Sequence, residues 1–236
     1  MNNSHDAKVW NGYADAMLFG EIAEIRDATP RSAPLNMALD EVLLAQSRAP
    51  LLRTYLWAHD AVSFGYFGKF APLPAAWPGR EIVRRMTGGG VVPHGDDLTY
   101  SLIVPAGHEF AARAPREVYR AVHAALAVLL ASGGGNAALA PAPSGLGNGV
   151  CFESPAEFDI IAGAEKIAGA AMRRTRDGLL LQGSIQSLPA LEALRTRIAA
   201  AFSTNVITTD FAPQQIAEAE LLATEKYATR EWTMRV

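Results

Sequence analysis

A glycine-rich stretch over residues 84–101 carries the residue types best suited to binding a ligand. It contains two basic residues, a threonine, three glycines and a histidine, in the order Arg84, Arg85, Thr87, Gly88, Gly89, Gly90 and His94. Glycine has no Cβ and tolerates positive φ, so the backbone of such a run can line a pocket closely. The glycines lead into a short strand, not a helix, and no Gly-Lys-Ser/Thr follows, which excludes a dinucleotide fingerprint and a phosphate-binding loop. A flexible connector is the simpler alternative.

Cys151 and Lys166 are suited to covalent and electrostatic catalysis. Cys151 is the only cysteine, which excludes an internal disulfide and a Cys-rich zinc site. It follows a stretch rich in Gly, Ala and Pro over residues 133–150, so we expect partial exposure, and a thiolate there can accept an acyl group. An ammonium at Lys166 would favour that thiolate. Taken alone, a single cysteine is more often a small buried residue, and an isolated lysine is more often solvated.

Two further groups of residues have two interpretations each. Gly169 and Ala170 give a strand small side chains, which leave room either for an aliphatic chain or for tight packing against a neighbouring element. His94, Asp96 and Asp97 are grouped like metal ligands, but no second cluster of His or Cys accompanies them in the sequence. We therefore predict no metal, and a turn in which the aspartates bond the local backbone.

Composition bounds the class of protein. The 236 residues are 50% hydrophobic with a net charge of −3, which is typical of a globular enzyme and gives no electrostatic footprint for nucleic acid. No apolar stretch reaches membrane-spanning length, so we predict a cytoplasmic location and no membrane partner. We predict one domain over residues 1–236, with an irregular N-terminal extension over 1–20. Arginines at 84, 85, 173, 174 and 176 suit either an acidic protein partner or a solvated face.

The spacing of apolar residues predicts intermixed helices and strands. Helices are expected over residues 36–46, 115–133, 189–202 and 213–227, and strands over 51–57, 61–67, 81–85, 98–104, 158–162, 166–174 and 179–187. The helix that begins at Pro115 carries one apolar stripe. Asp177 and Gly178 predict a hairpin between the last two strands. Residues 133–150 have no periodicity and are expected to form a long mobile loop.

Three segments together resemble the lipoate-protein ligase A and lipoyl/octanoyl transferase family: residues 84–101, 36–41 (Asn-Met-Ala-Leu-Asp-Glu) and 166–169 (Lys-Ile-Ala-Gly). The resemblance covers residues 30–235 and implies an α/β fold of the α+β type. The fold it implies has mixed, largely antiparallel sheets with packed helices, akin to the catalytic domain of biotin and lipoate protein ligases. It implies that Cys151 and Lys166 are catalytic. The substrate-binding residues are then Arg85, Thr87, Gly88, Gly89, Gly90, His94, Asp159, Gly169 and Ala170.

Within that family, residues 151–155 (Cys-Phe-Glu-Ser-Pro) resemble a segment of the cysteine-dependent octanoyltransferases. The resemblance implies transfer of an octanoyl or lipoyl group from a protein that carries it as a thioester, through a Cys151 acyl-enzyme. The acceptor would be a lysine of a lipoyl domain or of a glycine-cleavage H protein. No tightly bound cofactor is expected for this reaction.

Two positions, Gly90 and Asp159, look closer to the ATP-dependent ligases, and Gln182 stands where the family frequently has His. These departures leave the reaction type open. Against the ligase, the resemblance implies a catalytic domain with no accessory C-terminal domain. A lipoate-protein ligase would use ATP and Mg to convert a free acid into an acyl-adenylate. A third alternative is a non-catalytic module that binds acyl carriers. Such a module would need neither Cys151 nor Lys166, so the presence of both disfavours it.

Overall fold

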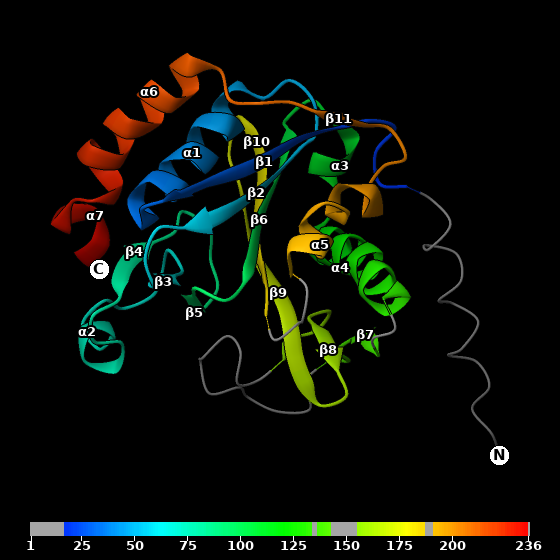
Figure 1. Ribbon diagram of the computed structural model, residues 1–236, viewed down its shortest axis with the longest axis horizontal. Coiled ribbons are helices and arrows are strands. Elements are labelled where there is room, and N and C mark those ends of the chain that lie inside the picture. Colours follow the sequence, from blue (N-terminus) through cyan, green and yellow to red (C-terminus); the bar gives the residue numbers. More distant parts are fainter. Residues whose placement is uncertain (1–16, 134–135, 143–154, 187–190, 236) are drawn as a thin grey trace.

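The structure is a computed structural model that describes residues 17–133, 136–142, 155–186 and 191–235. Its strands form an eight-stranded sheet, in the order β11-β1-β2-β6-β10-β9-β8-β7, and a three-stranded sheet, in the order β4-β3-β5 (Figure 1). The larger sheet consists of β1 (Ile22–Arg31), β2 (Leu51–Trp57), β6 (Leu98–Pro105), β7 (Ala137–Leu139), β8 (Ile160–Ala162), β9 (Glu165–Arg174), β10 (Gly178–Ile185) and β11 (Val206–Thr208). The smaller sheet consists of β3 (Ala61–Phe64), β4 (Glu81–Arg84) and β5 (Val91–His94).

Strand pairing in both sheets is mixed. In the larger sheet β1 pairs in parallel with β11 and β2, and the remaining neighbours pair antiparallel. In the smaller sheet β3 runs parallel to β4 and antiparallel to β5. The predicted fold class, α+β with mixed and largely antiparallel sheets, is confirmed.

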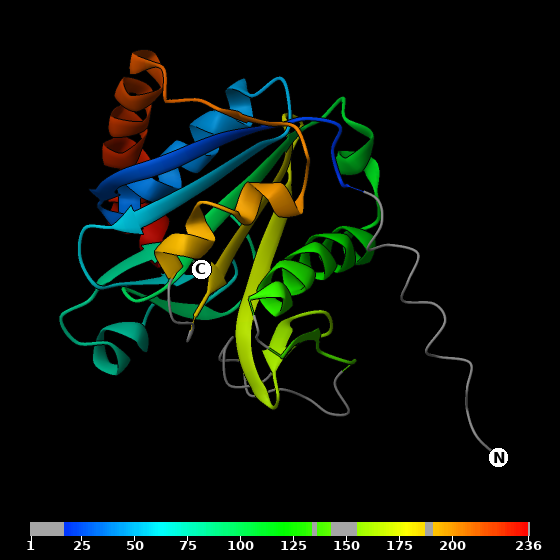
Figure 2. The same ribbon diagram turned by 45° about the vertical axis from the view of Figure 1, so that its right-hand side comes forward.

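Helices cover both faces of the larger sheet (Figures 1 and 2). One face carries α1 (Ala33–Gln46), α6 (Pro213–Leu222), the π-helical turn η3 (Ala223–Tyr227) and α7 (Arg230–Met234). The other carries α3 (Glu109–Ala112), α4 (Pro115–Ser132), α5 (Leu191–Arg195) and the 3-10 turn η2 (Ile198–Ala201). The short helix α2 (Leu73–Ala76) lies beside the smaller sheet.

Alternation along the strands divides the core between these two faces. Leu52 and Leu102 belong to the cluster on the α4 face, whereas Leu51 and Ile103 belong to a cluster with Leu43 of α1. Successive side chains of a strand point to opposite faces, so both faces of the central strands are apolar because both are covered. The same alternation directs Arg53, Ser101 and Gln182 towards Asp40 on the α1 face, where the pocket described below lies.

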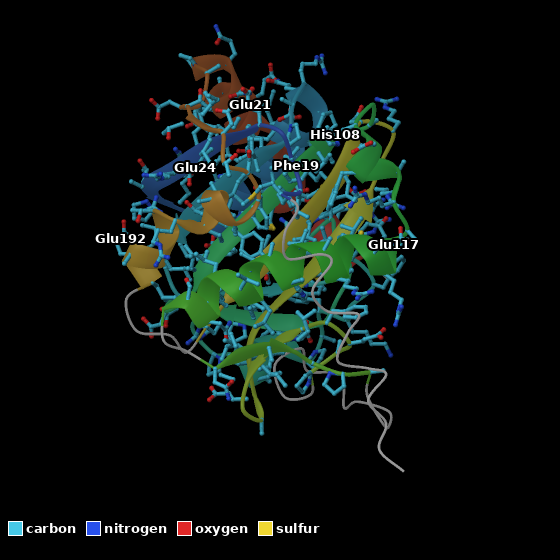
Figure 3. The ribbon with its side chains drawn as sticks, turned by 90° about the vertical axis from the view of Figure 1, so that its right-hand side faces the viewer. Phe19, Glu21, Glu24, His108, Glu117 and Glu192 are labelled. Atoms are coloured by element: carbon cyan, nitrogen blue, oxygen red, sulfur yellow. The ribbon has the colours of Figure 1, made fainter. Side chains whose placement is uncertain are left out.

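The first described residues pack onto the α4 face. Phe19 is buried, and its ring makes edge contacts with His108 at 5.5 Å and with Phe110 at 5.0 Å between centroids. Figure 3 looks onto this face, with α4 lying across the sheet and Phe19 close to His108. Aromatic pairs of this geometry fix the chain where it enters β1.

Several predicted elements are confirmed with small shifts. β2 has the predicted bounds, α4 buries its predicted stripe, and β9 and β10 form the predicted antiparallel hairpin. The predicted helix over 213–227 is present as α6 followed by η3. The predicted strand over 61–67 ends at Phe64, because Gly65 turns into close contact with the glycine-rich stretch.

Other expectations were wrong or incomplete. β1 was not predicted because charged residues interrupt its apolar pattern, and Glu24 and Asp27 are buried there beside arginines. The predicted loop over 133–150 contains β7, which pairs with β8. In the described part of the predicted helix over 189–202, α5 and η2 are separate elements. The short helices α2, α3 and α7 and the strand β11 also had no recognised pattern.

Candidate active site

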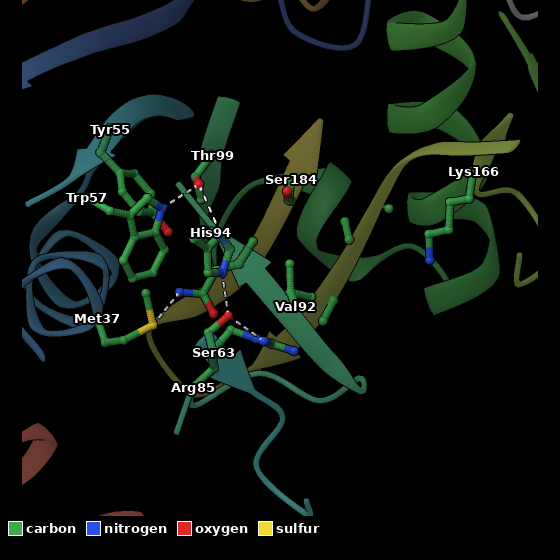
Figure 4. Close-up of a pocket in the computed structure, with 15 residues that line it drawn as sticks. Met37, Tyr55, Trp57, Ser63, Arg85, Val92, His94, Thr99, Lys166 and Ser184 are labelled. Carbon is green, nitrogen blue, oxygen red and sulfur yellow. Dashed lines mark hydrogen bonds between the residues drawn. The ribbon is translucent and has the colours of Figure 1, made fainter. Parts of the chain in front are cut away.

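A pocket lined by both sheets and α1 brings five of the predicted site residues together: Arg85, His94, Lys166, Gly169 and Ala170. Figure 4 shows Met37 and Trp57 beside His94, with Lys166 at the opposite end of the pocket. Among the lining residues that the sequence analysis did not select are Met37, Tyr55, Trp57, Ser63, Val92 and Thr99. They come from α1, β2, β3, β5 and β6, so only the tertiary fold places them in one site.

Arg85 holds the glycine-rich stretch in place. Its guanidinium donates to Ser63 Oγ at 2.7 Å and to the carbonyl oxygens of Gly88 and Gly90, each at 3.0 Å. A Cβ on Gly65 would lie 2.0 Å from the Gly89 oxygen, so the two backbones approach as closely as glycine allows. Three carbonyl and hydroxyl oxygens thus share one buried cation, which stabilises the stretch against the smaller sheet.

The glycine-rich stretch supports the pocket through contact with a residue that lines it. Gly89 has a φ of 84° and needs glycine's conformational freedom. Thr87 is buried, and its hydroxyl donates to Gln182 Oε1 at 2.7 Å. Gln182 lines the pocket. Direct contact of Thr87 and the three glycines with substrate stays a prediction.

His94 is fixed from three sides. Its Nδ1 lies 2.8 Å from Asp97 Oδ2 and its Nε2 lies 2.6 Å from Ser63 Oγ. The ring stacks on Trp57, with 4.1 Å between centroids and 18° between planes. A carboxylate only accepts, so Nδ1 donates to Asp97, and in the neutral ring Nε2 accepts from Ser63, whose oxygen already accepts from Arg85.

Asp97 is the buried anchor of this group. Burial raises its pKa, but the adjoining His94 and hydrogen bonds from His94, Ser184 and Thr99 lower it by more, so the pKa ends below its usual value. Its Oδ1 also accepts from the backbone N–H of Gly95 at 3.2 Å. The predicted turn, with an aspartate bonding the local backbone, is confirmed for Asp97.

Lys166 and Asp159 form a buried ion pair at the other end of the pocket. Lys166 Nζ lies 2.7 Å from Asp159 Oδ2, and the side chains are 5% and 6% exposed. A Cβ on Gly169 would lie 2.7 Å from Lys166 Cε, so glycine makes the space that the lysine occupies. Taken alone, Lys166 suggested a solvated surface residue, and that interpretation was wrong. The fold buries the lysine beside a carboxylate.

A network of buried polar residues supports the pocket on the α1 side. Gln182 Nε2 donates to Asp40 Oδ2 at 2.7 Å, and Asp40 Oδ1 accepts from Arg53 at 2.8 Å. Arg53 is fully buried and also pairs with Asp27 at 2.9 Å. Buried charges require such partners. The sequence signal for this network was Arg53, a charged residue in the middle of the largely apolar strand β2. A buried charge requires a partner, so Arg53 indicates a carboxylate on the same face of the sheet.

The arginine cluster divides into buried and exposed members. Arg84 is buried and donates to backbone oxygens of the 66–68 turn and of the C-terminal segment, including Tyr66 at 2.6 Å and Arg235 at 2.7 Å. Arg84 and Arg85 therefore serve the fold and the pocket, and neither expected place, a docking face or a solvated face, was right for them. Arg173 is half-buried and donates to the Met86 oxygen at 3.0 Å. Arg174 and Arg176 are exposed.

Cys151 lies outside the described residues, and its role stays a prediction. In the described ranges no three His, Cys, Asp or Glu side chains are grouped so that they could hold a metal ion. None of the helices in the same ranges is both long and apolar enough to cross a membrane.

Comparison with known proteins places these residues in a family. The family model described as "Lipoyl protein ligase A/B catalytic domain" matches residues 32–212. Octanoyltransferase LipM of Oceanobacillus iheyensis is 38% identical over 166 residues, which are 66% of this chain and 61% of the relative. The same-named protein of Staphylococcus aureus is 33% identical over 166 residues, 64% of this chain and 60% of the relative. The chain thus spans about three fifths of the length of these curated relatives.

Two solved structures share the fold. A lipoate-protein ligase A bound with ATP aligns with a TM-score of 0.67 and 22% identity, covering 91% of this chain and 98% of that chain. A bipartite lipoate protein ligase from Thermoplasma acidophilum, studied with its E2 lipoyl domain, gives a TM-score of 0.57 and 20% identity, covering 92% and 96%. The family model matches a range that includes both the glycine-rich stretch and the strand that carries Lys166. The chain therefore belongs to the lipoyl protein ligase A/B catalytic domain family.

Proposed function

We propose that this chain transfers an octanoyl or lipoyl group from a carrier thioester to a lysine of a lipoyl-carrier protein. The observation that carries the proposal is the buried Lys166–Asp159 pair at one end of a pocket whose other end is walled by Met37 and Trp57. Curated relatives named octanoyltransferase, at 31–38% identity, support the same reaction. Substrate contacts by the remaining predicted residues are part of this proposal.

An acyl chain in the pocket would extend from Lys166 towards Met37. The wall between these residues is apolar or small, because it includes Val92, Gly169 and Ala170. Burial of each CH₂ group contributes about 0.8 kcal/mol, so an alkyl chain gains affinity along this path. The acyl carbonyl would then lie beside the Lys166 ammonium. An ammonium there can stabilise the oxyanion of the tetrahedral intermediate, an effect worth about 3–4 kcal/mol in a site shielded from water.

The proposed reaction has two acyl-transfer steps. In the first, the Cys151 thiolate attacks the thioester carbonyl, a new C–S bond forms, and the bond to the carrier sulfur breaks, so the carrier leaves as a thiolate. In the second, the neutral amine of the acceptor lysine attacks the Cys151 thioester. The amide bond forms, the bond to Cys151 breaks, and the proton lost from nitrogen neutralises the departing thiolate.

The acceptor amine limits the second step. A lysine amine with a pKa of about 10.4 is only about 0.04% neutral at pH 7, so it must lose a proton at or near the site. The thioester donor is already activated. The transferase reaction therefore needs no ATP and no tightly bound cofactor.

An ATP-dependent lipoate-protein ligase is the second candidate. The residues that favour it are Gly90 and Asp159, which resemble the ligase branch, and the fold is shared with an ATP-bound ligase. In that reaction a free acid would first become an acyl-adenylate, with ATP and Mg supplied from solution. Lys166 would then bind the carbonyl of the adenylate, and Cys151 would be dispensable.

Two donors offered in parallel separate the candidates. The wild-type chain is incubated with octanoyl acyl-carrier protein, or with octanoate, ATP and Mg, each with a lipoyl domain or a glycine-cleavage H protein as acceptor. Transfer from the thioester, with a hydroxylamine-labile octanoyl adduct on the enzyme by intact mass, is the expected result. Transfer from octanoate with release of AMP would instead establish the ligase.

Cys151→Ser and Cys151→Ala are the matched controls. Both should abolish the thioester adduct and the transfer if the cysteine carries the acyl group. Full transfer by either variant would contradict the acyl-enzyme. If the wild type binds acyl-carrier protein but transfers from neither donor, the chain is a binding module.

A further inference from the structure

Phe158 adopts an unusual backbone conformation immediately before Asp159. Its φ is 69°, and it is the one non-glycine residue with positive φ in the ranges that the structure describes. A bulky residue in the left-handed region costs conformational free energy, so neighbouring contacts must hold it there. Phe158 is also buried. This feature sits beside the proposed catalytic pair, where residues with unusual backbone conformations tend to cluster.

His123 of α4 holds the carbonyl of this residue. Its Nδ1 lies 2.6 Å from the Phe158 oxygen, and because a carbonyl only accepts, Nδ1 carries the proton. His123 is fully buried, and burial lowers its pKa, although the Phe158 carbonyl and Asp159 act in the opposite direction. Nε2 has no partner among the described residues. The Phe158 carbonyl is therefore the one polar contact that the described structure gives this ring.

The same turn presents the Asp159 carboxylate to Lys166. Phe158 N–H donates to the Ala140 oxygen at 3.0 Å, and Asp159 N–H donates to the Ala156 oxygen at 3.0 Å. Asp159 Oδ2 accepts from the Ala156 N–H at 2.6 Å and lies 2.7 Å from Lys166 Nζ. The peptide between Phe158 and Asp159 carries both the oxygen that His123 holds and the Asp159 N–H, so a rotation of this peptide would break both bonds together.

A second contact from α4 fixes the other side of the pair. Tyr119, one helical turn before His123, donates its hydroxyl to the Ala170 oxygen on β9 at 2.7 Å. The two rings meet edge to face at 5.7 Å between centroids. α4 therefore holds both backbone segments that carry the ion pair, the turn before β8 and the strand β9.

From these contacts we propose that His123 is a positioning residue for the Lys166–Asp159 pair, acting through the carbonyl of Phe158. The inference rests on the proposed function only for the claim that Lys166 takes part in catalysis. Asn at position 123 can offer an N–H close to where Nδ1 lies, whereas Leu keeps an apolar side chain and removes the donor. These two variants separate the hydrogen bond from the burial of the side chain.

The lysine ammonium signal tests positioning without reference to activity. The chain has four lysines, so NMR spectra of ¹⁵N-lysine-labelled protein contain few ammonium signals. Loss of one signal in Lys166→Arg identifies the one that belongs to Lys166. His123→Asn should keep that signal, whereas His123→Leu should shift it and broaden it by solvent exchange. Leu126→Ala, a core substitution on the same helix, is the matched control and should leave it in place. An unchanged signal in His123→Leu would overturn the proposal.

A double-mutant cycle on turnover tests the route through Asp159. His123→Leu alone should lower turnover roughly tenfold to a hundredfold, because misplacement of a catalytic group by about 1 Å has effects of that size. The Michaelis constant should stay within about twofold. In an Asp159→Asn background the same substitution should change turnover no further, whereas multiplying effects would mean that His123 acts on the fold in general. If the wild type transfers no acyl group, the proposed function fails, and the ammonium signal still decides the positioning claim.

Discussion

The two ends of the pocket are built in different ways. At the His94 end, the donors and acceptors of His94, Ser63 and Asp97 satisfy one another across β3, β5, β6 and β10. At the Lys166 end, one ion pair joins β9 to the turn at Asp159, beside an irregularity in the pairing of β8 and β9. A network whose members are all satisfied is rigid and selects shape. A buried ammonium can instead act on a reacting carbonyl. We infer that the first end binds the acyl chain and the second performs the chemistry.

The largest expected effect comes from removing the charge at the reactive end. Lys166→Ala should lower turnover by about two to three orders of magnitude, the usual loss when a single oxyanion donor is removed. Melting temperature should also fall, because Asp159 loses its buried partner. Steady-state transfer and thermal melting measure the two effects.

Lys166→Arg tests whether charge alone suffices. The lysine occupies a space that a Cβ on Gly169 would invade, and a planar guanidinium does not replace a compact ammonium there. Turnover should therefore stay well below wild type. Near-normal turnover of Lys166→Ala with either donor would refute the chemical role of this end and leave a binding module.

The next effect concerns the close approach at the binding end. In Gly65→Ala the new Cβ would lie 2.0 Å from the Gly89 oxygen, so the glycine-rich stretch must move at a cost of about 1–3 kcal/mol. Unfolding by urea should show this loss, with a raised Michaelis constant. Gly107→Ala is the control, since its Cβ would meet no atom within 4 Å and Gly107 does not line the pocket. Equal losses in both variants would mean that the contact is not the cause.

Asp97 should make stability depend on acidity. Its pKa is lowered in the folded state, so its contribution is present above the unfolded value of about 3.9 and is lost as pH falls through the folded value. Asp97→Asn should be less stable than wild type at pH 7, and the gap should narrow below pH of about 4. A gap that does not change with pH in denaturant titrations would show that the ionised carboxylate contributes nothing.

The smallest expected effect on activity comes from exposed arginines that lie outside both ends of the pocket. Arg174→Glu with Arg176→Glu should raise the Michaelis constant for a protein donor or acceptor less than about tenfold, since exposed charges interact weakly and are screened by salt. Hydrolysis of a small thioester should not change, because neither side chain lines the pocket. An equal loss on both substrates would assign the arginines to the fold.

The sequence predicted the reactive end better than the binding end. At the reactive end, Lys166 and Gly169 lie in one short contiguous pattern, so their types and spacing were visible. At the binding end, only the glycine-rich stretch with Arg85 and His94 forms such a pattern. Trp57, Ser63 and Thr99 come from three strands of the two sheets and meet only after the chain folds. No local pattern encodes that meeting.

The remaining differences between the prediction and the structure come from charged residues that the fold buries. Arg84 and Arg85 are adjacent charges that resemble a solvated pair, yet the fold gives them several carbonyl partners and buries both. β1 was missed for the same reason, since Asp27 is buried against Arg53 of the next strand. Charges interrupt an apolar pattern in the sequence, and only their distant partners explain why they are tolerated.

The most direct test measures turnover and the Michaelis constant for octanoyl acyl-carrier protein in Lys166→Ala and His94→Asn side by side. Lys166→Ala should lose turnover and keep its Michaelis constant, because its charge acts on the transition state. His94→Asn removes the ring stacked on Trp57 and should raise the Michaelis constant with turnover largely kept. If both variants lose turnover and affinity in the same proportion, the division between a binding end and a reactive end is wrong.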